Sequence, residues 1–227
     1  MSCKRTIRLD LEYDGTDFSG WQIQGQGRTV QGELARCLSA FLQEKILPVG
    51  AGRTDAGTHA LGQVAHFHTS SAHGSKRMER ALNGLLPDDI AVTCVREVLD
   101  DFHARYSALC KRYRYRMSTR KTAVGRRTAW SVYWPLDIEA MIVASKALPG
   151  MHSFRPFCNS NPIPDNYECD IFDVSWDRPD GELIFEIEAN RFLRHMVRII
   201  IGTLVAVGAG RLAALEEERQ LQLRFQA

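Results

Sequence analysis

The stretch Ala51-Gly52-Arg53-Thr54-Asp55-Ala56-Gly57-Thr58-His59-Ala60 separates an apolar run at residues 46–49 from an alternating run at residues 63–68. Alternation of apolar and polar side chains is typical of a half-buried strand, so we expect strands on both sides. The glycines permit tight turns and close approach of a ligand. Because functional residues concentrate on loops held by rigid elements, we expect a strand–loop–strand unit that presents the single carboxylate of Asp55.

Outward from this unit, the same periodicities predict the remaining elements. In the first half we expect a helix N-capped by Thr29, a helix at residues 76–85, and strands at residues 6–13 and 90–98. In the second half we expect helices at residues 138–148 and 192–207, and strands at residues 111–117, 167–176 and 182–188.

The order of these elements predicts an α+β protein. We expect two similar α+β halves that share a mixed, largely antiparallel sheet, with the helices on one face. The first half, residues 1–104, carries the Asp55 loop. The second, residues 105–227, carries a basic strand with tyrosines and a long apolar helix.

Composition limits the class of protein. The chain has 227 residues, 44% hydrophobic residues and a net charge of +2, which are ordinary globular values that indicate no particular partner. Six scattered cysteines, without a CxxC pair or a signal peptide, favour reduced thiols. No apolar run approaches the roughly 18 residues that cross a membrane. We therefore expect a cytoplasmic protein without membrane contact.

Arg53 lies two residues from Asp55, so both side chains point to the same side of an extended loop. A neighbouring guanidinium keeps a carboxylate ionised, as a nucleophile or base requires. The alternative is a structural salt bridge, against which His59 and the glycines weigh. Arg198 is a second candidate partner, because we expect it to be partly buried in the helix at residues 192–207, one turn after Arg194. Its alternative is a side chain that extends to solvent.

A basic run extends from Arg105 to Arg127 without any Asp or Glu. On a strand, Tyr113 and Tyr115 share one face, and Arg112, Arg114 and Arg116 share the other. Cations neutralise phosphates and aromatic rings stack on bases, so the run favours nucleic-acid binding. The alternative is a strand with its tyrosines in the core and its arginines in water.

Other chemistries lack support in the sequence. His66 and His68 share a strand face, but no third ligand has metal-site spacing, so we expect no metal. No phosphate-binding loop, dinucleotide fingerprint or serine nucleophile elbow is found. The sequence favours chemistry by one carboxylate without a cofactor.

These segments together resemble the TruA family of tRNA pseudouridine synthases. The resemblance runs in family order from about residue 6 to residue 209. Its blocks are Glu12-Tyr13-Asp14-Gly15, Gly20-Trp21-Gln22, Thr29-Val30-Gln31, Gly52 to Gly57 with His59-Ala60 and Gln63-Val64, Asn83, Leu86-Pro87, Asp101 to Arg105, Lys111 to Tyr115, and Phe192 with His195 to Arg198.

The resemblance implies a role for each matching residue. Asp55 matches the catalytic aspartate, and Arg53 the arginine that holds the target nucleotide out of its stack. Tyr113 matches the tyrosine that stacks on the uracil, and Arg198 the arginine that pairs with the aspartate. We expect His59, Arg105, Lys111, Arg112 and Arg114 to contribute to substrate binding. Attack of Asp55 on the base, attack on the sugar and removal of a ribose proton all remain open.

The resemblance also implies the pseudouridine synthase fold with a catalytic cleft between its halves, a homodimer, tRNA as partner rather than DNA, and no cofactor. The resemblance implies that the targets of the enzyme are uridines of the anticodon stem-loop, at tRNA positions 38 to 40. Thr58 and Ser153 depart from the family's usual Val and Asp. The Glu- and Gln-rich residues 212–227 replace a family segment that lines the pocket, so we expect this chain to be truncated there.

Two other classes of protein compete with this interpretation. One is a non-catalytic RNA-binding protein or tRNA chaperone of the same fold, which has lost turnover with its C-terminal segment. The other is a glycosidase-like hydrolase, which requires a second placed carboxylate that the sequence does not show.

Overall fold

The computed structural model describes residues 4–160 and 164–212. Contacts along the backbone divide the chain into two compact units, Met1–Ala108 and Leu109–Ala227. Within the described ranges, no helix combines the length and apolar composition that crossing a membrane requires. The five cysteines in these ranges form no disulfide.

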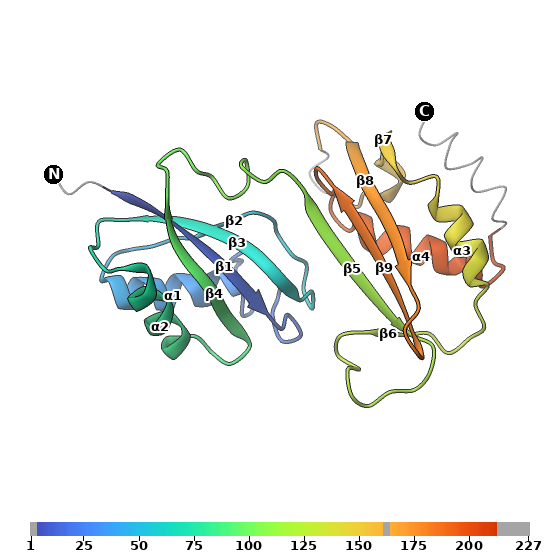
Figure 1. Ribbon diagram of the computed structural model, residues 1–227, viewed down its shortest axis with the longest axis horizontal. Helices are drawn as coiled ribbons and strands as arrows, with labels where there is room; N and C mark the ends of the chain where they lie inside the picture. Colours follow the sequence, from blue (N-terminus) through green and yellow to red (C-terminus); the bar gives the residue numbers. More distant parts are fainter. Residues whose placement is uncertain (1–3, 161–163, 213–227) are drawn as a thin grey trace. The chain divides into compact units, whose positions relative to one another are not determined.

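The first unit is a four-stranded sheet with two helices on one face (Figure 1). Its elements are β1 (Arg5–Tyr13), α1 (Val30–Leu42), β2 (Val49–Gly50), β3 (Ala60–Thr69), α2 (Ser75–Leu85) and β4 (Ile90–Val98). The strand order is β2-β3-β1-β4, and every pair is antiparallel. Alternate residues of β1, namely Ile7, Leu9 and Leu11, are fully buried. The strict alternation of the sequence therefore produces one buried face and one polar face.

The second unit contains a five-stranded sheet, also with its helices on one face (Figure 1). Its elements are β5 (Lys111–Ser118), β6 (Trp130–Ser131), α3 (Ile138–Ser145), β7 (Gly150–Ser153), a 3₁₀ turn (Arg155–Phe157), β8 (Glu168–Asp177), β9 (Glu182–Ala189) and α4 (Met196–Gly208). The strand order is β6-β5-β9-β8-β7. Among the described strands of this unit, only β6 runs parallel to its neighbour. Phe185 and Met196 lie in the core between sheet and helices.

The predicted α+β class and the largely antiparallel pairing are confirmed. Thr29 caps α1 as expected, because its Oγ1 accepts from the Gly32 amide at 3.3 Å. The single shared sheet was not found, since the strands of the described ranges pair in two sheets. Alternation shows which face of a strand is buried but does not show which strand pairs with its edge.

Two local predictions need correction. The strand expected at residues 46–49 is reduced to Val49–Gly50. The last helix begins at Met196 and not at residue 192, because His195 has a left-handed backbone (φ 62°) that a helix cannot contain. Arg194 therefore precedes the helix and shares no helix face with Arg198. The expected truncation concerns residues 212–227, of which all but Leu212 lie outside the described ranges.

Candidate functional site

The loop that joins β2 to β3 is fixed by main-chain hydrogen bonds to the segment that follows β1. The Trp21 amide donates to the Thr54 carbonyl at 3.0 Å, and the Gly57 amide donates to the Phe18 carbonyl at 3.2 Å. Within the loop, the Thr58 amide donates to the Asp55 carbonyl at 3.1 Å. Asp55 itself is half-buried. The carboxylate is thus presented by a backbone that is bonded on both sides of it.

Two glycines bring the segments into backbone contact. A Cβ on Gly15 would lie 2.0 Å from the Thr58 carbonyl oxygen, and a Cβ on Gly20 would lie 2.7 Å from the Thr54 carbonyl oxygen. Gly20 also has a φ of +91°, which disfavours any residue with a Cβ. The glycines of the segment after β1 therefore set how close the Asp55 loop lies to it.

Buried polar side chains of β1 and β3 form hydrogen bonds with the Asp55 loop. The Tyr13 hydroxyl lies 2.8 Å from Thr54 Oγ1, and Gln63 Nε2 donates to the Gly52 carbonyl at 2.9 Å. Tyr13 is only 4% exposed, and this burial raises the pKa of its hydroxyl, so the phenol stays neutral. Tyr13 and Gln63 belong to blocks of the family resemblance, but no contact with the loop was predicted for either of them. The available signal was a polar group at a predicted buried position of a strand, next to the loop.

The other two candidates in the loop differ in their surroundings. Arg53 is exposed. His59 Nδ1 lies 2.9 Å from Asp14 Oδ1 and 3.2 Å from the Gly15 amide. An unprotonated Nδ1 accepts from the amide, whereas a protonated one donates to the carboxylate. In both states His59 holds the Asp55 loop against the turn after β1.

In the second unit, β5 has the two faces expected from its sequence. Tyr113 and Tyr115 pack against the core on the helix side, and the Tyr113 ring meets the Phe192 ring edge-on at 4.9 Å. The Phe192 contact was not expected from the sequence. Arg198 is the third residue of α4, and it is exposed rather than partly buried, because the buried face of the helix passes through Met196 and Ile200, two residues before and after it.

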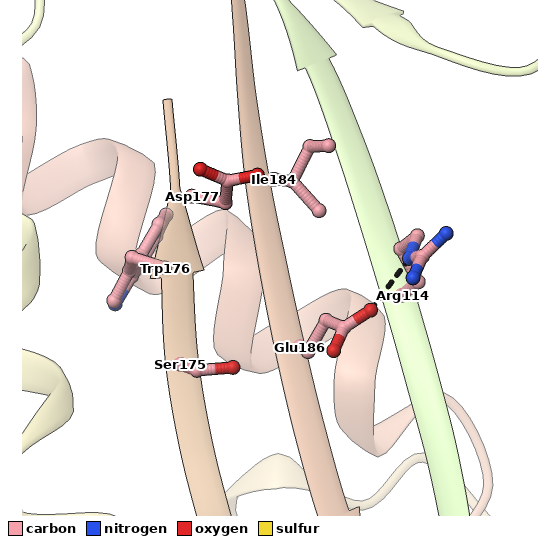
Figure 2. Close-up of a pocket in the computed structure, with 6 residues that line it drawn as sticks. All are labelled: Arg114, Ser175, Trp176, Asp177, Ile184 and Glu186. Atoms are coloured by element: carbon pink, nitrogen blue, oxygen red, sulfur yellow. Dashed lines mark hydrogen bonds and ion pairs between the residues drawn. The ribbon is translucent and has the colours of Figure 1, made fainter. Parts of the chain in front are cut away.

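The arginines on the other face of β5 are paired with glutamates of β9. Arg114 Nε lies 2.5 Å from Glu186, Arg112 Nη2 lies 2.5 Å from Glu188, and Arg116 Nη2 lies 2.7 Å from Glu182. Figure 2 shows the Arg114 pair at a hollow of about 290 Å³, which Ser175, Trp176, Asp177 and Ile184 also line. The acid-free run suggested a cationic face, but a strand distant in the sequence supplies the carboxylates.

The candidates divide between the units. Arg53, Asp55, His59 and Arg105 belong to the first unit, whereas Lys111, Arg112, Tyr113, Arg114 and Arg198 belong to the second. A second hollow, of about 650 Å³, is lined by Glu97, Phe102 and their neighbours and does not include Asp55. Across the described ranges, no group of three or more His, Cys, Asp or Glu side chains is placed to hold a metal ion.

Comparison with known proteins identifies the family. The family model described as tRNA pseudouridine synthase matches residues 11–107 and 144–224. A protein from Chlorobium luteolum named tRNA pseudouridine synthase A is 46% identical over 209 residues, which is 92% of this chain and 83% of the relative. Proteins of the same name are 47% identical in Halalkalibacterium halodurans (97% of this chain, 85% of the relative) and 43% identical in Acetivibrio thermocellus (97% and 91%). This chain therefore belongs to the tRNA pseudouridine synthase family, which is a family of isomerases.

Proposed function

We propose that this protein converts uridine to pseudouridine in tRNA, with Asp55 as the catalytic carboxylate. The target uridines are those of the anticodon stem-loop, at positions 38 to 40. The observation that supports the assignment most directly is the Asp55 loop, whose main chain is bonded to the segment after β1 on both sides of the aspartate. Rigid placement of one charged group is what a reaction at a single base requires.

The reaction cleaves the uridine C1′–N1 bond, turns the base and rejoins it to C1′ through C5. The hydrogen on C5 leaves as a proton, so atoms and electrons balance without a cofactor. Asp55 assists bond cleavage, Tyr113 stacks on the uracil, and Arg198 pairs with the aspartate. Arg53 holds the flipped nucleotide, and His59 supports the loop through its contacts with Asp14 and Gly15.

The uridine must leave its stack to reach Asp55, which costs a few kcal/mol. Stacking on one aromatic ring contributes about 1–3 kcal/mol, and phosphate contacts contribute more. Phe192 meets the Tyr113 ring edge-on, which limits the positions the ring can take and supports its use as a stacking platform. Arg105, which is exposed, and Lys111 are the phosphate contacts in this proposal.

The family resemblance further supports two parts of the proposal that concern the whole molecule. Two chains associate as a homodimer that grips tRNA, and the enzyme acts in the cytoplasm. Sedimentation of the purified protein measures its oligomeric state directly, and a monomer at micromolar concentration would contradict the homodimer.

Tritium release tests the activity. The protein is incubated with tRNA transcripts that carry tritium at C5 of uridine, and tritium in the solvent is counted. We expect release from transcripts with uridine at positions 38 to 40 and none from transcripts that lack uridine there. Binding of tRNA without release would favour the rival, a non-catalytic RNA-binding protein of the same fold.

Arg112 and Arg114 each form an ion pair with a glutamate of β9, which reduces the charge that they can offer to a phosphate. Because Glu186 already neutralises Arg114, we expect Arg114→Gln to change tRNA affinity by less than about twofold, within the range of exposed ion pairs. Arg112 is paired with Glu188 in the same way, and this contact lowers the pKa of Glu188. Fluorescence anisotropy with labelled tRNA checks the prediction, and a loss of about fivefold or more would restore Arg114 as a phosphate contact.

A further inference from the structure

The loop between β5 and β6, residues 119–129, contains the cations of the basic run that follow β5. Its cations are all exposed, namely Arg120, Lys121, Arg126 and Arg127. Within the described residues, no carboxylate lies within ion-pair distance of Arg120, Lys121 or Arg126. No Asp or Glu occurs between Phe102 and Leu136. Positive charge therefore persists in this loop, in contrast to β5.

The loop has a defined course. The Thr119 amide donates to the Gly181 carbonyl at 3.2 Å, and the Thr128 amide donates to the Gly125 carbonyl at 2.9 Å. Arg116 Nη1 donates to Thr128 Oγ1 at 3.1 Å. The cations are thus attached to the end of the sheet, which reduces the entropy that a ligand must remove when it binds.

A row of aromatic rings leads from the sheet to the surface beside this loop. The centroid of the Trp130 ring lies 6.2 Å from that of the Tyr115 ring and 6.4 Å from that of the Trp134 ring. The Arg211 guanidinium lies 5.7 Å from the Trp134 ring. Trp134 is 39% exposed, and Tyr133, its neighbour in the sequence, is 63% exposed. Exposed rings next to unpaired cations are the features that bind unpaired bases and their phosphates.

The neighbouring sheet surface lacks excess positive charge. The glutamates of β9 balance the arginines of β5, and the exposed residues of β8 add Asp173 and Asp177, which share a strand face because they lie four residues apart. Figure 2 shows Asp177 close to Ile184, and both line the same hollow as the Arg114–Glu186 pair. A phosphate backbone is repelled by these carboxylates and attracted by the loop. Charge complementarity therefore places nucleic acid at residues 119–134 and not on the open face of the sheet.

We propose that residues 119–134 form a tRNA contact of their own, in which Lys121 and Arg126 hold phosphates and Tyr133 stacks on an unpaired base. This inference rests on the proposed function for the identity of the RNA. Ser118, where the loop begins, is five residues along β5 from Tyr113, or about 17 Å at 3.3 Å per residue. The contact therefore engages nucleotides other than the uridine stacked on Tyr113.

The test compares two charge-matched double variants. Lys121→Gln with Arg126→Gln removes two loop cations, and Lys146→Gln with Arg178→Gln removes two exposed cations elsewhere in the same unit. We expect the loop variant to bind tRNA about tenfold more weakly, and the slope of log K against log salt to decrease in magnitude by about 1.4–1.8. The control variant should bind within about twofold of the wild type, with an unchanged slope. Because these residues lie away from the reacting base, kcat at saturating tRNA should remain at the wild-type value.

Tyr133→Ala provides an independent measurement. Loss of one stacked base predicts about tenfold weaker binding without a change in salt slope. Wild-type affinity in the loop variant, or an equal loss in the control variant, would overturn the inference. Absence of tritium release from the wild type, together with selective loss of binding in the loop variant, would reject the proposed function and retain this contact. Normal tritium release by the wild type, together with unaffected tRNA binding in the loop variant, would retain the proposed function and reject this contact.

Discussion

Asp55→Asn is expected to reduce tritium release from tRNA by on the order of 10³-fold or more, the loss found when an essential catalytic group is removed. Asn matches Asp in size, and the bonds that fix the loop join main-chain atoms of Thr54, Asp55, Gly57 and Thr58. The variant should therefore fold and keep its affinity for tRNA. The loss should appear in kcat, because the carboxylate acts on the uridine that has already been bound.

Asp100→Asn is the matched control, since Asp100 is an exposed aspartate of the same unit and has no assigned role. Its tritium release should stay within about twofold of the wild type, as expected for a surface substitution. Thermal unfolding of both variants checks that they are folded. Release by Asp55→Asn at the wild-type rate would exclude Asp55 as the catalytic group and leave the family assignment intact.

Much of the fold could be predicted because strand alternation and helical spacing are local signals. The strand at residues 90–98 was found with its observed limits, and α3 was found with its first residue. β6 and β7 were missed, since strands of two and four residues are too short to show a period. The late start of α4 depends on the left-handed backbone of His195, and histidine gives little indication of such a conformation.

Local sequence was less informative about the surroundings of the candidate site residues. Asp55, Arg53 and His59 occur within seven residues, so their shared loop was evident. Tyr13 and Gln63 reach that loop from two strands, and only the β1–β3 pairing places them there. The Arg114–Glu186 pair likewise spans 72 residues. Contacts set by strand register are tertiary, and a count of charges along the chain cannot predict them.

The contacts of the glycines that support the loop also could not be predicted from the sequence. In the sequence, Gly15 belongs only to the block Glu12-Tyr13-Asp14-Gly15 of the family resemblance, and nothing indicates which residue faces it. In the structure, its α-carbon lies so close to the loop between β2 and β3 that a methyl group on it would be 2.0 Å from the Thr58 carbonyl oxygen. This neighbour is backbone and belongs to the loop that carries Asp55, so a clash here must move the loop or the turn.

Gly15→Ala is therefore expected to lower kcat/KM by about 100-fold, the loss associated with a displacement of about 1 Å in a catalytic group. Overpacking at this contact should also lower the free energy of unfolding by about 1–3 kcal/mol. The measurements are tritium release at several tRNA concentrations and denaturant unfolding. The loss of activity should exceed what instability explains, because a protein with 5 kcal/mol or more of stability (a typical value) stays folded after such a change.

Two other glycines separate the possible causes. Gly25→Ala is the neutral control, because a Cβ there meets nothing within 4 Å, and its activity should match the wild type. Gly57→Ala also meets nothing within 4 Å, but its φ of +74° makes the substitution strained, so it measures backbone strain in the same loop without a clash. We expect Gly57→Ala to lose less activity than Gly15→Ala. Equal activity in Gly15→Ala and Gly25→Ala would show that the backbone contact between Gly15 and Thr58 does not position Asp55.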